Sequence, residues 1–192
     1  MAETKKLILI TSPPACGKTR LAKRLSEKIG NVVYLDKDSV IPLSHRIFSV
    51  AHKPFNRSSK FFNTEIREYE YEAILNIALL ALNYNDRVIL NAPFTSEVRE
   101  EEPFRHLKHR LSGLGAELVV VWIQSNADIC YARMKKRNSE RDGWKLSHWE
   151  EYVKGVNFAP PENLGDSLLL YDGTSDEKGE ESFDVIYQKL KR

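Results

Sequence analysis

Cysteine and long apolar segments are scarce in this sequence of 192 residues. Its two cysteines, Cys16 and Cys130, are too few for a disulfide framework or for a zinc site of the Cys-x-x-Cys type. The apolar stretch nearest the start, LILIT at residues 7–11, is short and is soon followed by two prolines, which argues against a signal peptide or a membrane span. We therefore expect a cytoplasmic protein without a membrane anchor or a structural zinc ion.

An excess of charge of one sign is also missing, because 29 lysines and arginines stand against 27 acidic residues. This balance neither requires a nucleic-acid partner nor excludes one that binds a local basic patch. The hydrophobic content of 42% is sufficient to bury one substantial core. Internal repeats and low-complexity tracts are absent, so we expect residues 1–192 to form a single domain.

Short apolar runs alternate with amphipathic stretches of helical length, the pattern of a parallel sheet covered by helices. The expected strands are Leu7–Thr11, Val32–Leu35, Arg87–Leu90, Leu118–Ile123 and Leu168–Tyr171. The expected helices are Lys18–Ile29, Phe61–Leu82, Glu97–Leu111, Asp128–Lys136 and Ser182–Lys191. Polar stretches at residues 51–60 and 156–166 are expected loops. The pattern predicts an α/β fold with three layers, α/β/α, around about five parallel strands.

The stretch SPPACGKT at residues 12–19 lies between the first expected strand and the first expected helix. It matches the phosphate-binding loop pattern except that Ser12 replaces the first glycine. Gly17 leaves the backbone bare for phosphate oxygens, Lys18 offers a charge to the terminal phosphates and Thr19 offers a hydroxyl to Mg²⁺. Ser12 must take up a turn that glycine adopts more freely, which weakens the motif without abolishing it. The expected nucleotide-binding residues are Ser12, Pro13, Pro14, Ala15, Cys16, Gly17, Lys18 and Thr19.

Two alternatives accompany this interpretation of the loop. One is that residues 17–19 simply begin an ordinary helix, although the flanking strand and helix favour the motif. The other concerns Cys16, which we interpret as a small residue filling a loop position, with a redox-sensitive thiol as the alternative.

Two aspartates follow the second expected strand, in the stretch VVYLDKDS. Asp36 and Asp38 are two residues apart, so they lie on one side of an extended chain. The carboxyl ends of strands in an open parallel sheet face the ligand crevice. We therefore expect Asp36 to serve Mg²⁺ and Asp38 to accept the proton of a phosphoryl acceptor. The alternative is that both are turn residues or that Asp38 caps a helix beginning at Ser39.

Asn91 ends the third expected strand, at a position where many nucleotide hydrolases carry an aspartate on the magnesium side. Its amide can hydrogen-bond a water or an acceptor but adds no charge. We expect Asn91 to contact the acceptor, and a purely structural asparagine at a strand end is the alternative.

A basic stretch, ARMKKRNSERDGWKL, follows the fourth expected strand. Arg133 and Arg137 are four residues apart and so share one helical face, and Arg141 follows across a polar turn. We expect Arg133 to contact the nucleotide, while residues 137–146 form a lid that closes over it and neutralises the transferred phosphoryl group. A solvated basic face is the alternative.

The segment 39–62 combines aromatic and basic residues and is the expected acceptor-binding segment, with Arg46 as a candidate contact. Rings such as Phe48 and Phe55 could stack a base beside a phosphate-binding side chain. The alternative is that these aromatic residues pack into the core.

Together these segments resemble the small P-loop kinases, in particular the polynucleotide 5′-kinases and their zeta-toxin and chloramphenicol-phosphotransferase relatives. The resemblance runs from residue 7 to about residue 152 and is carried by SPPACGKT, LDKDS and KRNSER. It implies a P-loop NTPase fold of the nucleotide-kinase type with a small cap. It further implies phosphate and magnesium contacts by Lys18 and Thr19, a general base at Asp38, and cap arginines at Arg137 and Arg141.

Three positions depart from the pattern of these kinases. Ser12 replaces a loop glycine, Ile41 replaces a substrate-contacting arginine and Asn91 replaces an aspartate. The last two changes fall on acceptor-binding positions. Loss of an arginine weakens the recognition of a phosphate-rich substrate, which weighs against a nucleic-acid 5′ end as the acceptor.

We therefore predict an ATP- and Mg²⁺-dependent phosphotransferase that moves the γ-phosphate to a hydroxyl of a small molecule, nucleoside, nucleotide or nucleic-acid 5′ end. The expected catalytic residues are Lys18, Asp38, Arg137 and Arg141. One alternative is a nucleotide-binding regulatory ATPase or switch without an acceptor, and another is a nucleotide-binding remnant without catalysis. No obligate protein partner is expected.

Overall fold

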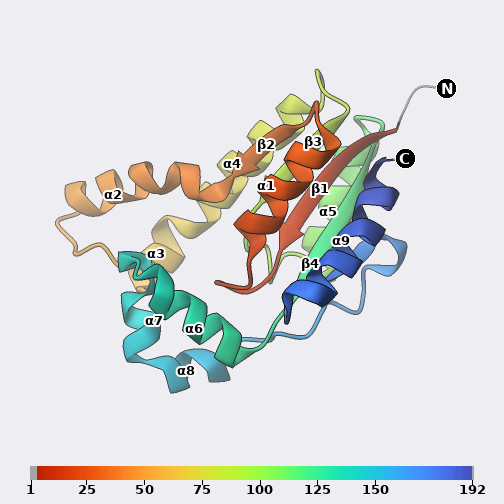
Figure 1. Ribbon diagram of the computed structural model, residues 1–192. Coiled ribbons are helices and arrows are strands. Elements are labelled where there is room, and N and C mark those ends of the chain that lie inside the picture. The colour runs from red at the N-terminus through yellow and green to blue at the C-terminus, as the bar shows by residue number, and fades with distance from the viewer. Residues whose placement is uncertain (1–3, 192) are drawn as a thin grey trace.

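A computed structural model of the protein describes residues 4–191, so residues 1–3 and 192 of the predicted domain lie outside the described residues. Five strands form one sheet in the order β2-β3-β1-β4-β5, and every neighbouring pair is parallel (Figure 1). The strands are β1 (Lys5–Thr11), β2 (Val33–Asp36), β3 (Arg87–Asn91), β4 (Ala116–Gln124) and β5 (Leu168–Asp172). The predicted α/β class and the number of parallel strands are confirmed.

Helices cover both faces of the sheet. Those of the two outer layers are α1 (Lys18–Ile29) and α9 (Asp176–Lys191) on one face and α4 (Arg67–Ala81) and α5 (Glu101–Ser112) on the other. Successive side chains of a strand point to opposite faces, so Leu7 and Leu9 pack toward α4 and α5 whereas Ile8 and Ile10 pack toward α1 and α9. The central strands are apolar without alternation for this reason. Within residues 4–191, no helix is long and apolar enough to span a membrane.

Two excursions of the chain lie beyond the carboxyl ends of the strands (Figure 1). One follows β2 and contains η1 (Lys37–Val40), α2 (Ile41–Val50) and α3 (Lys60–Glu65). The other follows β4 and contains α6 (Ala127–Arg137), η2 (Glu140–Asp142), α7 (Gly143–Ser147) and α8 (Trp149–Lys154). A short turn, η3 (Gly165–Ser167), leads into β5. Both excursions start where the sheet presents its ligand-facing edge.

The first excursion differs from the sequence prediction. The expected helix 61–82 is divided into α3 and α4 at Ile66, whose side chain is buried with Phe48 and Phe62 in a small separate cluster. The helix α2 was not expected. Pro42 fits its first turn, and the buried face formed by Ser44 and Phe48 packs it against the rest of the protein.

Other helix boundaries also differ. The helix α5 begins at Glu101 rather than Glu97, with Pro103 in its first turn, where the missing N–H costs little. The helix α9 begins at Asp176, six residues before the predicted start. The short helices α7 and α8 were not predicted, since each is too brief for helical periodicity to be read from the sequence.

Candidate functional site

The phosphate-binding loop connects β1 to α1, as expected. Its left-handed backbone positions are Ala15, with φ 65°, and Gly17, with φ 108°. Ser12 is not among the residues of the described chain that have positive φ, and its side chain is buried. The expectation that Ser12 must adopt a glycine-like turn is therefore wrong, and serine is accommodated there without strain. Gly17 precedes the first residue of α1, so unpaired N–H groups of the helix start face the loop.

Lys18 crosses back over the loop. Its Nζ donates to the carbonyl oxygens of Ser12 and Pro13, at 2.9 Å each. Burial disfavours the charged ammonium and lowers the pKa of Lys18 to about 8. A phosphate group would stabilise the charged form, so this position is suited to bind an anion.

A cavity of about 390 Å³ opens in front of the loop. It is lined by the loop, the ends of β2 and β3, the start of α4, and the segment from α6 to α7. Among the eight predicted loop residues, those that line it are Pro14, Ala15, Gly17, Lys18 and Thr19. The other three loop residues, Ser12, Pro13 and Cys16, are buried and do not line the cavity. Their contribution is therefore to the shape of the loop.

Thr19, Asp36 and Asn91 meet at one side of the cavity. The Asn91 amide donates to Thr19 Oγ1 at 3.0 Å and to Asp36 Oδ2 at 2.8 Å. Tyr34 Oη also donates to Asp36 Oδ2, and burial raises the pKa of Tyr34 to about 12, which keeps this donor protonated. The other carboxylate oxygen, Asp36 Oδ1, accepts from the backbone N–H of Asp38. The position predicted for an acceptor contact, Asn91, thus joins the two predicted magnesium residues.

The oxygens of Thr19 and Asp36 fit the hard-oxygen preference of Mg²⁺. Within residues 4–191 there is no group of three or more acidic, histidine or cysteine side chains arranged to hold a metal ion. Mg²⁺ in phosphate-binding sites commonly uses one or two protein oxygens together with phosphate and water, so a larger protein cluster is not required. The donor set therefore suits a nucleotide-bound magnesium ion.

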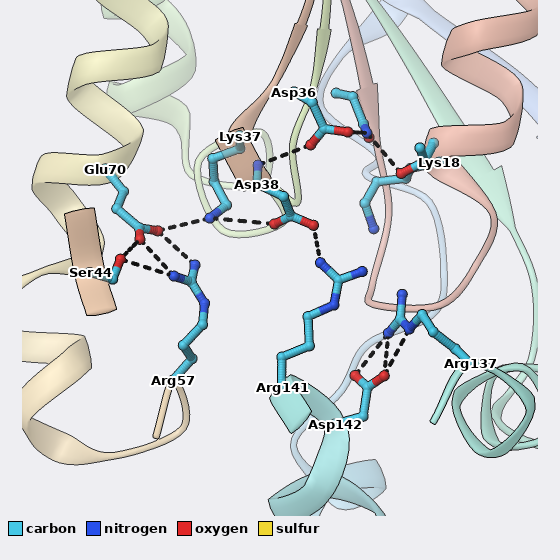
Figure 2. A network of polar contacts seen from close by, with 12 residues as sticks. Lys18, Asp36, Lys37, Asp38, Ser44, Arg57, Glu70, Arg137, Arg141 and Asp142 are labelled. Carbon is cyan, nitrogen blue, oxygen red and sulfur yellow. Dashed lines mark hydrogen bonds and ion pairs between the residues drawn. The ribbon is translucent and has the colours of Figure 1, made fainter. Parts of the chain in front are cut away.

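Asp38 lies just after the carboxyl end of β2, and Arg141 of the second excursion contacts it (Figure 2). The Arg141 guanidinium donates to the Asp38 carboxylate, and Lys37 Nζ lies 4.0 Å from the other carboxylate oxygen. All three side chains line the cavity. The predicted base and a predicted cap arginine are thus brought into direct contact.

The other predicted arginines also line the cavity. Arg137 forms two hydrogen bonds of 2.8 Å with Asp142, whose side chain is almost fully buried (Figure 2). Arg133 donates to the carbonyl oxygens of Cys16 and Gly173, at 2.9 and 3.0 Å. Arg133 therefore braces the phosphate loop, and Arg137 fixes the turn that carries Arg141.

A buried ionic cluster next to Asp38 was not predicted from the sequence. Glu70 on α4 accepts hydrogen bonds from Lys37, Ser44 and Arg57 (Figure 2). The side chains of Lys37 and Glu70 are only 4% and 5% exposed. Each buried charge is therefore stabilised by the opposite charge beside it rather than by water. The carboxylate holds η1, α2 and the 51–60 loop in fixed positions. Its only sequence signal is a charged residue on the apolar side of a helix, which does not reveal the partners.

The predicted acceptor segment 39–62 contributes Arg57 and Phe62 to the cavity wall. Arg46, the candidate contact, is exposed on α2 and does not line the cavity. His45 stacks on Phe55 with ring centroids 3.6 Å apart, and Phe55 packs against Phe48. The structure does not bring Arg46 to the other site residues, and the rings of this segment contact one another.

The sequence matches the model of the family described as an AAA domain over residues 7–157, so the chain belongs to this family. A comparison with curated proteins found no match. The fold is that of the small P-loop kinases, as the sequence predicted.

Three solved structures share this fold. A candidate kinase from Chloroflexus aurantiacus J-10-fl has 18% identity and a TM-score of 0.64, with 97% of both chains covered. A gluconokinase from Sinorhizobium meliloti 1021 has 11% identity and a TM-score of 0.57, with 99% of this chain and 97% of that chain covered. The APS kinase of Mycobacterium tuberculosis, in complex with AMPPNP and APS, has 16% identity and a TM-score of 0.58, with 98% and 99% covered.

Proposed function

We propose that the protein is an ATP- and Mg²⁺-dependent phosphotransferase that moves the γ-phosphate of ATP to a hydroxyl group. The observation that carries this proposal is the position of Asp38 in the same cavity as Lys18 and Thr19. A general base within reach of a phosphate-binding loop is the arrangement that phosphoryl transfer to an alcohol requires. The kinase fold of the structural neighbours supports the same reaction class.

In this proposal the loop amides and Lys18 hold the β- and γ-phosphates. Thr19 and Asp36 hold Mg²⁺, directly or through water, and Asn91 keeps their oxygens together. Bound Mg²⁺ would neutralise charge on the phosphate oxygens. Arg133 would keep the loop in shape through the Cys16 carbonyl oxygen.

Asp38 would orient the acceptor hydroxyl and take its proton as the oxygen attacks the γ-phosphorus. A new P–O bond forms to the acceptor, the bond to the bridging oxygen breaks, and ADP leaves. Arg141 and Arg137 would lie over the transferred group as parts of a cap formed by residues 137–146 and neutralise its charge. Each arginine is already held by a carboxylate, Asp38 or Asp142, which limits the side-chain entropy lost when substrate binds.

The acceptor in this proposal is an alcohol that carries an anionic group. Lys145 lines the cavity beyond Asp38, and its Nζ donates only to the carbonyl oxygen of Arg141 at 3.0 Å, with no carboxylate of residues 4–191 in ion-pair contact. Burial and the nearby charges of Arg137, Arg141 and Arg57 lower the pKa of Lys145, and the Asp142 carboxylate offsets only part of this effect. A partly buried ammonium close to several arginines is stabilised by an incoming anion.

The cavity wall also contains the aromatic and apolar side chains of Phe62, Tyr71 and Pro93. Arg57 lies over Phe62 and Arg67 lies over Tyr71, with the guanidinium carbon 4.4 and 4.5 Å from the ring centroids. Such walls suit a compact organic anion with an apolar face. Gluconate, an anionic alcohol, is the type of acceptor named by one structural neighbour.

The test measures transfer of labelled γ-phosphate from ATP to pairs of related acceptors, of which one member carries an anionic group and the other does not. The pairs are ribose and ribose 5-phosphate, glucose and gluconate, glycerol and glycerol 3-phosphate, and a nucleoside and its 3′-monophosphate, with a 5′-hydroxyl oligonucleotide as a separate arm. We expect labelling of the anionic member of at least one pair, and none with the Lys18→Ala variant. Label on the oligonucleotide alone would contradict a compact acceptor.

The Lys145→Gln variant tests the anion contact, with Lys136→Gln as its control because Lys136 is exposed on the same excursion. We expect Lys145→Gln to raise KM for the anionic acceptor about tenfold or more while leaving KM for ATP unchanged, since one charge-assisted hydrogen bond is lost. If ATP is hydrolysed equally well with every acceptor and with none, a nucleotide-dependent switch replaces the kinase proposal.

A further inference from the structure

The two cysteines of the chain lie in contact although 114 positions separate them. Their Sγ atoms are 3.4 Å apart, with Cys16 in the phosphate loop and Cys130 in the second turn of α6. Both side chains are almost fully buried in the core cluster that also holds Ile10 and Ile123. The sequence gives no reason to pair them, because neither occurs in a cysteine motif.

We propose that Cys16 and Cys130 are an oxidation site that forms a reversible intramolecular disulfide and thereby disables the phosphate loop. The cross-link itself depends only on the contact of the two thiols, whereas its effect on ATP rests on the proposed function. The disulfide requires the two sulfur atoms to approach to about 2.05 Å, from a starting separation at which they already touch.

The surroundings favour reaction at Cys130. The hydrogen-bond contact with Cys16 lowers the pKa of Cys130 from its ordinary value, and Ser125 and Arg133 add to this effect. For the same reason the pKa of Cys16 is raised. The pair therefore provides one thiolate that can attack an oxidant and one neighbouring thiol that can resolve the product.

With hydrogen peroxide as the oxidant, the Cys130 thiolate attacks one peroxide oxygen. An S–O bond forms, the O–O bond breaks, and the leaving hydroxide takes up a proton to become water. The Cys16 sulfur then attacks the sulfenic sulfur of Cys130. An S–S bond forms, the S–O bond breaks, and the released hydroxide takes up the Cys16 proton and leaves as a second water. Two thiols are oxidised, and one peroxide is reduced.

Closure of this bond alters the loop because Cys16 lies between its two left-handed residues. Ala15 and Gly17 both have positive φ and both line the nucleotide cavity. The Cys16 carbonyl oxygen also accepts the hydrogen bond from Arg133 that braces the loop. Bond formation must bring the two sulfur atoms together by more than 1 Å, the difference between 3.4 Å and a disulfide bond length of about 2.05 Å, and this closure pulls on the loop backbone at Cys16. Amides that cradle phosphate tolerate little displacement.

The test treats the reduced, full-length protein with hydrogen peroxide, followed by peptide mapping without reductant. We expect a protein mass that is lower by two hydrogen atoms, and one linked peptide pair that contains Cys16 and Cys130. Hydrogen exchange of residues 12–19 should change, and a fluorescent ATP analogue should bind about tenfold more weakly or worse, equivalent to about 1.4 kcal/mol. Dithiothreitol should reverse all four changes.

The Cys130→Ser and Cys130→Ala variants are the controls, because Cys130 does not line the cavity. We expect both to bind the ATP analogue like the reduced wild type, before and after peroxide. Oxygen adducts without a cross-link, a disulfide between two molecules, or a cross-link that leaves loop exchange and ATP affinity unchanged would overturn the proposal. A reduced wild type that binds no ATP would contradict the proposed function, while the peptide map and loop exchange would still decide the disulfide.

Discussion

Arg141 donates a hydrogen bond to the carboxylate of Asp38, although the two residues are 103 positions apart in the chain. The contact joins the excursion after β4 to the end of β2 across the front of the phosphate loop (Figure 2). A basic residue of the proposed cap thereby contacts the carboxylate that we propose as the general base. Both groups are positioned before any acceptor enters.

The first prediction concerns this carboxylate. The Asp38→Asn variant cannot take a proton from the acceptor but keeps the shape of the side chain, so kcat should fall by about 10²–10⁴-fold. ATP affinity should change little, because the loop and Lys18 are untouched. Steady-state kinetics and a separate ATP-binding titration check both statements. The Asp184→Asn variant, at an exposed position of α9, is the control, and equal losses in the two variants would refute the assignment.

A second prediction follows from the buried charge of Glu70. Burial alone would raise the pKa of Glu70. Hydrogen bonds and ion pairs with Arg57 and Lys37 outweigh that effect and lower the pKa to about 2. The native pKa is depressed below the unfolded value of 4.5, so this carboxylate stabilises the fold above pH 4.5, and that stability is lost as the pH falls toward 2. The Glu70→Gln variant should reduce the free energy of unfolding at pH 7 by about 3–5 kcal/mol.

Urea unfolding at pH 7 and at pH 3 measures this effect. The loss caused by Glu70→Gln should be smaller at pH 3, where protonation of the unfolded state has already reduced the contribution of the wild-type carboxylate. The Glu72→Gln variant changes an exposed residue of the same helix and should stay within about 0.5 kcal/mol of the wild type. A Glu70→Gln protein as stable as this control would show that the cluster does not depend on the carboxylate.

The third prediction concerns the pH dependence of nucleotide binding. Burial lowers the pKa of Lys18 to about 8, so the ammonium loses its proton at alkaline pH unless a phosphate stabilises it. ATP affinity should therefore decline as the pH rises from 7 to 10, approaching about tenfold per pH unit above pH 8, and binding there should take up a proton. Calorimetry in buffers of different ionisation enthalpy measures the proton uptake. The Lys18→Ala variant should bind more weakly with a flat profile, and a flat wild-type profile would exclude Lys18 as the titrating group.

The fourth prediction concerns the amide of Asn91. Replacement by aspartate removes the donor to Asp36 and Thr19 and places a second negative charge beside Asp36. The Asn91→Asp variant should lose about 2 kcal/mol of stability without Mg²⁺, because a hydrogen bond to a charged group is lost. Mg²⁺ should recover most of that loss, in contrast to its small effect on the wild type without nucleotide.

Thermal unfolding with and without Mg²⁺ tests this statement, and Asn63→Asp, at an exposed position of α3, serves as the control. An Asn91→Asp protein that is less stable but indifferent to Mg²⁺ would argue against a metal ion between residues 19 and 36.

Periodicity and local motif chemistry were sufficient for much of the fold. Alternating apolar runs and amphipathic stretches predicted the parallel sheet, because strands buried on both faces must be apolar throughout. The loop could be found because a strand, a Gly-Lys-Thr sequence and a helix follow one another without interruption. The error at Ser12 arose because the motif gives residue types and not backbone angles, and the left-handed residues proved to be Ala15 and Gly17.

The sequence by itself determined the α/β class, the phosphate loop and the carboxylates at the end of β2, since each depends on residues that are neighbours in the chain. Only the tertiary structure decided the pairing of Asp38 with Arg141, the burial of Glu70 among its cations and the contact of Cys16 with Cys130. These contacts join segments that lie on different strands and helices. Their energies depend on distance and burial, which no local pattern encodes.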